Sequence, residues 1–184
     1  MLNESKTIEY KREFTEDIKK TVTAFANTDG GKIFIGINNE KQIVGLKEPD
    51  HVLLQVGNLI RDSIRPDVTL FTDLTISEQD GKPIVVIDVQ RGTARPYYIA
   101  GKGIRPEGVY VRQGSATVPA SESAILQMIK DTSGDSYENA RSLNQNLSFD
   151  TATIFFNKQE IAFGESQKKS LRLIASDGMY TNLG

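Results

Sequence analysis

Apolar residues near the start of the chain recur at helical spacing and then give way to a strand-like run. The helical face consists of Ile18, Val22, Phe25 and Ala26. The polar, glycine-rich segment 27–31 that follows is typical of a helix end. The apolar, β-branched run Lys32–Ile37 then predicts a buried strand, and Gln42–Leu46 is expected to return beside it as the second strand of a hairpin.

The middle of the chain repeats this order of helix and then strands. Apolar residues at helical spacing between positions 52 and 64 predict a second helix, which Pro66 closes. The runs Val68–Ile76 and Pro83–Gln90 flank a turn and predict a second hairpin. The stretch Arg91–Pro106 is predicted to be mainly loop with one short apolar piece, Tyr97–Ala100. A further strand is predicted at Gly108–Arg112 and a third helix at Ser121–Lys130. This order indicates an α+β fold with a mixed, mostly antiparallel sheet flanked by two or three helices.

The composition changes after this third helix. Residues 132–148 are mainly polar and are expected to form a linker between a domain over residues 1–131 and a tail over residues 149–184. The tail has two helix-like segments, Thr151–Asn157 and Glu165–Ile174, although the first of them also fits a strand. We expect this tail to be a truncated helical segment that leads into a further C-terminal region.

Charge and rare residues narrow the possible functions. The 184 residues include 22 Lys and Arg against 24 Asp and Glu, which gives a net charge of −2. The absence of cysteine excludes disulfide scaffolds, cysteine–zinc sites and thiol chemistry. A single histidine, His51, excludes a metal site built from several histidines. The first ten residues have no apolar core of a signal peptide, so a cytoplasmic protein without membrane association is expected.

Two carboxylates close to the start are candidates for metal-dependent chemistry. Glu4 and Glu9, with Lys11 nearby, are the residue types that a Mg²⁺- or Mn²⁺-dependent nuclease uses to hold its metal and to steer a phosphate. The same residues also fit a solvated, charged strand. The glycine-rich segments 27–32 and 101–106 match neither a Walker loop nor a dinucleotide fingerprint, and we interpret them as a helix stop and a loop.

A basic segment in the second half of the domain is a candidate binding surface. Between positions 91 and 112 there are five basic residues and one acid, Glu107, so the local charge is +4. The basic residues are Arg91, Arg95, Lys102, Arg105 and Arg112, and Tyr97, Tyr98 and Tyr110 are interleaved with them. Cations with aromatic rings suit phosphates and stacked bases. An ordinary solvated hairpin is the alternative.

Six segments of the chain form a distinctive series in a fixed order: Glu4–Lys11, Ala24–Gly31, Ile35–Ile37, Val44–Gly45, Arg95–Tyr98 and Gly108–Thr117. Together they resemble a known family, the Schlafen-type AlbA domain, over about residues 4–130. The end of the chain, from Asp177 on, resembles the start of the region that follows this domain in bacterial regulators. Those proteins commonly continue into ATPase-like or winged-helix parts.

The resemblance implies a nucleic-acid-binding domain, and we expect the non-catalytic module of a bacterial transcriptional regulator. DNA is the expected polymer and RNA the alternative, and no cofactor is expected. The residues expected to contact phosphates are Lys11, Arg12, Lys32, Arg95 and Arg112. Tyr97 and Tyr110 are expected to stack on bases. Because eukaryotic relatives build a basic valley from two lobes, a homodimer with two facing basic segments is expected here.

Two alternatives to this function follow from the same residues. The first is a metal-dependent endoribonuclease that uses Glu4 and Glu9, as RNA-cleaving relatives do, with Mg²⁺ or Mn²⁺. The third carboxylate of those enzymes corresponds to Asn38-Asn39 here, and a neutral amide binds such metals more weakly. The second alternative is a protein-interaction or assembly module, in which the basic segment meets an acidic partner.

Overall fold

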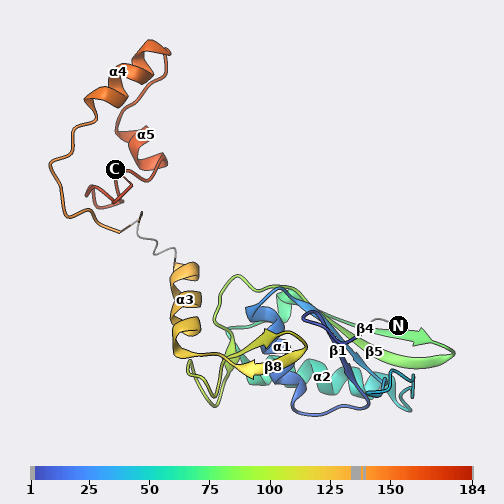
Figure 1. Ribbon diagram of the computed structural model, residues 1–184. Helices are drawn as coiled ribbons and strands as arrows, with labels where there is room; N and C mark the ends of the chain where they lie inside the picture. Colours follow the sequence, from blue (N-terminus) through green and yellow to red (C-terminus); the bar gives the residue numbers. More distant parts are fainter. Residues whose placement is uncertain (1–2, 134–137, 139, 184) are drawn as a thin grey trace. The chain divides into compact units, whose positions relative to one another are not determined.

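The computed structural model describes residues 3–133, 138 and 140–183, which group into two compact units, Met1–Ile129 and Lys130–Gly184. The first unit carries most of the regular structure (Figure 1). Its helices are α1 (Ile18–Asn27), α2 (Pro49–Ser63), the 3₁₀ turn η1 (Thr69–Phe71) and α3 (Glu122–Ser133), which runs across the boundary between the units. Its strands are β1 (Ile8–Lys11), β2 (Gly31–Ile35), β3 (Ile64–Arg65), β4 (Thr72–Gln79), β5 (Lys82–Val89), β6 (Tyr98–Ile99), β7 (Tyr110–Gln113) and β8 (Ala116–Pro119).

A four-stranded sheet in the order β1-β2-β5-β4 is the frame of this unit. Strand β1 runs parallel to β2, whereas the β2–β5 and β5–β4 pairs are antiparallel. The short strands pair separately, β3 with β6 and β7 with β8. The fold is therefore α+β with a mixed, mostly antiparallel sheet and flanking helices, as the sequence predicts.

Helices α1 and α2 cover one face of the sheet, and the core lies between these helices and the sheet (Figure 1). Successive side chains of a strand point to opposite faces, so the alternate residues Ile33, Ile35 and Ile87 face the helices and are fully buried. Burial of each such side chain contributes about 1.5–3 kcal/mol. The side chains between them point to the other face, where Tyr10 and Phe34 form a smaller apolar cluster.

The predicted strand at Gln42–Leu46 is wrong. Only an isolated bridge joins Ile37 to Ile43, and the long antiparallel partner of β2 is β5. The reason is local, because Gly36 and Gly45 both adopt positive φ angles, +109° and +77°, and bend the chain out of a regular ladder. The N–H groups of Val44 and Gly45 both donate to the Gly36 carbonyl, at 2.8 and 3.0 Å, in place of a ladder.

The second unit contains α4 (Asp150–Lys158) and α5 (Glu165–Ser170), which confirms two helical segments in the tail. Aromatic side chains form its centre, where the rings of Phe156 and Phe163 stack at 4.8 Å and the ring of Phe149 lies 5.5 Å from that of Tyr180. Part of the predicted linker, residues 134–137 and 139, lies outside the described residues. Among the helices of the described residues, none has both the length and the apolar character that a membrane span requires.

Candidate functional site

The side chain of Arg112 is buried between β7 and the start of the chain. Its guanidinium has no solvent exposure and its Nη1 donates to the Glu9 carboxylate at 2.9 Å. The same group donates to Thr117 Oγ1 at 2.8 Å and to the Ser5 carbonyl at 2.7 Å, and it lies 4.9 Å from the centre of the Phe25 ring. Arg112 therefore ties the β7–β8 hairpin to β1. It does not face solvent, so we correct its predicted contact with phosphate.

Both oxygens of the Glu9 carboxylate accept hydrogen bonds from cations. Lys11 Nζ donates to Oε1 at 2.8 Å, and Arg112 donates to Oε2. Because the carboxylate is only 11% exposed, this ion-pair network is largely shielded from water. The Lys11 ammonium, predicted to contact phosphate, is thus engaged by Glu9 and only partly exposed.

The other two positions of the three-carboxylate pattern have local structural partners. Glu4 Oε1 accepts from the Tyr10 backbone N–H at 3.0 Å. Asn38 closes the turn after β2, because its side chain donates to Gln42 Oε1 and accepts from the Gln42 N–H. Within the described residues, no three His, Cys, Asp or Glu side chains gather closely enough to hold a metal ion. The geometry therefore adds no support to the nuclease alternative.

The side chain of Asn27, at the end of helix α1, joins two segments that are distant in sequence, at Tyr97 and Tyr110. Asn27 is 3% exposed, and its side-chain amide donates to the Tyr97 and Tyr110 carbonyls at 2.9 and 3.0 Å. Its oxygen accepts from the Tyr97 N–H at 2.7 Å. Gly30, at φ +79°, leaves room for the Val89 carbonyl, which would lie 2.6 Å from a Cβ. This segment is a structural joint and not a phosphate loop, in agreement with the helix-stop interpretation.

The two tyrosines predicted to stack on bases are buried instead. Tyr97 has no exposed surface, and its ring packs edge-on against Phe71 at 6.3 Å. Tyr110 is 8% exposed and lies under the Lys20 ammonium, which is 6.0 Å from its ring centre. Neither ring is available to a base, so we correct both assignments.

The remaining predicted cations do not gather on one surface. Lys32 forms an ion pair with Asp88 at 2.6 Å across β2 and β5. Arg95 is half-buried, whereas Arg12 is exposed at the end of β1. In the basic segment itself, Arg91 lies 3.9 Å from Asp29, whose pKa is lowered by a hydrogen bond from Lys6. Ion pairing thus offsets part of the +4 charge that the sequence shows here.

A cationic hollow of about 550 Å³ lies at the opposite end of β1 from the Lys32 pair and was not predicted. Three cations, Arg12, Lys47 and Lys82, and one carboxylate, Glu13, line it. The rest of the lining comes from the chain segment Val44–Leu46 and from Pro83. We call it the Arg12 hollow.

The backbone around the Arg12 hollow explains how its cations meet. The N–H groups of Gly36 and Ile37 both donate to the Lys11 carbonyl, at 2.8 and 3.1 Å, which fixes the chain just before Arg12. The Leu46 N–H donates to the Pro83 carbonyl at 2.9 Å and so brings Lys47 beside Lys82. Lys82 Nζ in turn donates to the Ile43 carbonyl at 2.8 Å. Lys47 and Lys82 are far apart in sequence, so no local sequence pattern predicts that they lie close together.

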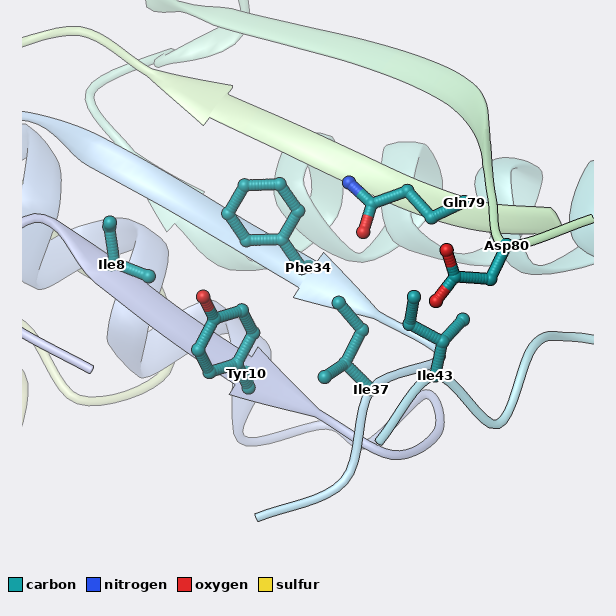
Figure 2. A pocket seen from close by; sticks show the side chains of 7 residues that line it. All are labelled: Ile8, Tyr10, Phe34, Ile37, Ile43, Gln79 and Asp80. Carbon is teal, nitrogen blue, oxygen red and sulfur yellow. The ribbon is translucent and has the colours of Figure 1, made fainter. Parts of the chain in front are cut away.

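A second hollow, of about 470 Å³, lies on the face of the sheet away from the helices. Figure 2 shows Ile8, Tyr10, Phe34, Ile37 and Ile43 around it, with Gln79 and Asp80 at one side. The rings of Tyr10 and Phe34 are 5.6 Å apart. Burial, and then the charge of Glu4, raises the pKa of the Tyr10 phenol, which therefore stays neutral. The lining has one carboxylate and no cation, so this hollow does not suit a phosphate.

These features define an α+β domain in which a buried ion pair locks a β-hairpin to the sheet and a cationic hollow opens beside the end of β1. The chain belongs to the family described as Schlafen, AlbA_2, whose profile matches residues 4–121. This match confirms the resemblance that the sequence motifs indicate.

Two solved structures are similar to this chain. The crystal structure of the DIP2311 protein from Corynebacterium diphtheriae has a TM-score of 0.53 and 15% sequence identity, and the match covers 96% of this chain and 34% of that chain. This chain thus spans about a third of the length of that protein, and the likeness is one of fold. The solution NMR structure of the N-terminal domain of a RecG-related protein from Nitrosomonas europaea has a TM-score of 0.43 and 27% identity, over 60% of this chain and 78% of that chain.

Proposed function

We propose that this domain binds nucleic acid through the Arg12 hollow, as the non-catalytic DNA-holding module of a bacterial transcriptional regulator. The observation that carries the proposal is the charge of the hollow, where Arg12, Lys47 and Lys82 stand against the single carboxylate of Glu13. Clustered cations on a concave surface attract phosphates even when the net charge of the protein is slightly negative, as it is here.

The lining of the hollow favours contact with the phosphate backbone of a duplex. No aromatic side chain lines it, and Tyr97 and Tyr110 of the basic segment are buried. Proteins that hold single strands rely largely on aromatic stacking. A duplex, in contrast, presents its phosphates outermost, where cations reach them without unstacking a base. We therefore propose double-stranded DNA as the preferred polymer, with RNA as the alternative that the experiment below distinguishes.

The proposal includes no catalytic step. Glu9, the best-placed carboxylate of the nuclease alternative, has both oxygens engaged by Lys11 and Arg112. A metal ion would have to displace at least one of these cations. Cleavage of RNA in the presence of Mn²⁺ by the native chain would overturn this part of the proposal.

The salt dependence of affinity tests the site. If three phosphates are neutralised, log K for a duplex should fall against log salt with a slope of about −3. The double variant Lys47→Ala/Lys82→Ala should flatten the slope by about 2, because two of the three cations are gone. Fluorescence anisotropy with labelled duplexes of DNA and of RNA, and with single strands, measures both quantities.

A matched variant controls for the loss of net charge. Arg61→Ala/Lys102→Ala also removes two exposed cations, both outside the hollow. This control should leave the slope within about 0.5 of the native value. If the two double variants flatten the slope equally, the hollow is not the binding site. Tighter binding of RNA than of DNA would make RNA the proposed polymer.

A further inference from the structure

A groove beside helix α3 is lined mainly by apolar side chains. It has a volume of about 310 Å³ and lies between α3 and the loop 104–106. The loop contributes Ile104, Arg105 and Pro106, and the helix contributes Glu122, Ile125, Leu126 and Ile129. The loop belongs to the basic segment that the sequence singles out, and the nucleic-acid proposal gives it no role.

Helix α3 carries apolar side chains on its exposed side as well as on the side that packs into the first unit. Ile125 and Met128 face inward, are 5% and 6% exposed, and pack in a cluster with Val109. Leu126 and Ile129 point elsewhere and are 58% and 40% exposed. A surface helix normally carries one apolar stripe, so this second stripe indicates an unsatisfied contact surface. Ile104, which is 50% exposed, extends the same surface across the groove.

The same surface carries one charge of each sign. Arg105 lies on the loop side of the groove and Glu122 on the helix side. Arg105 Nε donates to the Lys102 backbone carbonyl at 2.6 Å. Among the residues that the structure describes, no carboxylate pairs with Arg105 and no cation pairs with Glu122. Both side chains are exposed, so each charge is accessible to an opposite charge on a partner.

We propose that a second copy of this chain docks on this surface about a two-fold axis. Such an interface uses one patch twice, so the patch must be complementary to itself. The α3 surface has this property, because it carries exposed apolar side chains, Leu126 and Ile129, together with a cation on one side of the groove and an anion on the other. The apolar side chains of the two copies pack against each other, and Arg105 pairs with Glu122 of the partner subunit. This interface is separate from the Arg12 hollow and does not depend on nucleic acid.

Sedimentation velocity of the full chain over 1–100 µM, without nucleic acid, tests the proposal. We expect a reversible dimer with a dissociation constant that Leu126→Glu raises at least about tenfold, since a charge would enter the apolar groove. Leu70→Glu is the matched control, because Leu70 is 93% exposed, lies on η1 and does not line the groove. Circular dichroism checks that each variant is folded. A native chain that stays monomeric at 100 µM, or a dimer that Leu126→Glu leaves unchanged, would overturn the proposal.

Charge reversal tests the two-fold geometry specifically. Arg105→Glu and Glu122→Arg should each weaken the dimer, because like charges then meet across the axis. The double variant Arg105→Glu/Glu122→Arg should restore the native affinity to within about threefold, because the ion pair forms again with its two charges exchanged. A dimer that both single reversals weaken and the double reversal does not restore would exclude this pairing.

Discussion

Replacing Arg112 by Met is expected to lower the free energy of unfolding by about 3 kcal/mol. The substitution keeps an apolar stem of similar length beside Phe25 but leaves the buried Glu9 carboxylate with Lys11 as its remaining cation. It also removes the donors that the Ser5 carbonyl and Thr117 Oγ1 accept from. The midpoint of urea unfolding, followed by circular dichroism, measures the loss.

An exposed arginine provides the comparison for this variant. Arg91 is 52% exposed and lies 3.9 Å from Asp29, so Arg91→Met should change stability by less than about 0.5 kcal/mol. The double variant Glu9→Gln/Arg112→Met should lose at least about 1 kcal/mol less than the sum of its single variants, because the two side chains share one interaction. Additive losses, or an Arg112→Met loss below about 1 kcal/mol, would contradict a buried structural pair.

The position of Glu9 also affects how a nuclease assay is interpreted. Glu9→Gln removes an anion that two cations contact, so we expect this variant to be less stable than the native chain. Loss of cleavage in Glu9→Gln would then not identify a catalytic carboxylate unless the variant is shown to be folded. Glu4→Gln is a better test, because Glu4 is exposed and its carboxylate accepts one backbone hydrogen bond.

Asn27→Ala is the second large effect that the structure predicts, a loss of about 3 kcal/mol. The variant removes three hydrogen bonds and leaves two carbonyls and one N–H, of Tyr97 and Tyr110, without their partner in a buried place. Because these groups hold β6 and β7 against α1, amide hydrogen exchange should also speed up in both strands. Differential scanning calorimetry and hydrogen exchange measure the two effects.

Another asparagine with side-chain hydrogen bonds serves as the control. Asn38 closes an exposed turn through Gln42, where water can replace the lost partner. Asn38→Ala should therefore cost less than about 1 kcal/mol. If Asn27→Ala cost no more stability than Asn38→Ala, the hydrogen bonds of Asn27 would not be what holds the basic segment in place.

Local patterns were sufficient for the elements whose partners are near in sequence or whose burial is strong. The helical stripe of α1, the apolar run of β2 and the two strands of the β4–β5 hairpin are all in the structure. The predicted strand at 42–46 failed because the positive φ angles of Gly36 and Gly45 cannot be read from an apolar–polar alternation. Strand β8 was not predicted, because only two of its four residues, Ala116 and Val118, are apolar.

The candidate site was less predictable because its contacts join distant parts of the chain. Arg112 and Glu9 are separated by 103 residues, and nothing near either residue indicates that they pair. A basic residue in a charged segment is usually solvated, so burial of Arg112, and of Tyr110 two residues before it, depends on the hairpin folding against β1 and α1. Arg12 was predicted as a contact residue, but Lys47 and Lys82 become its neighbours only through the pairing of Leu46 with Pro83.

Amide chemical shifts during titration with a DNA duplex test the central claim, that nucleic acid is held at the Arg12 hollow. The account predicts that the largest shifts in a ¹H–¹⁵N spectrum occur at Arg12, Gly45, Lys47 and Lys82, and that they disappear at high salt. Shifts confined to the basic segment around Lys102, or no shifts at millimolar duplex and low salt, would contradict it.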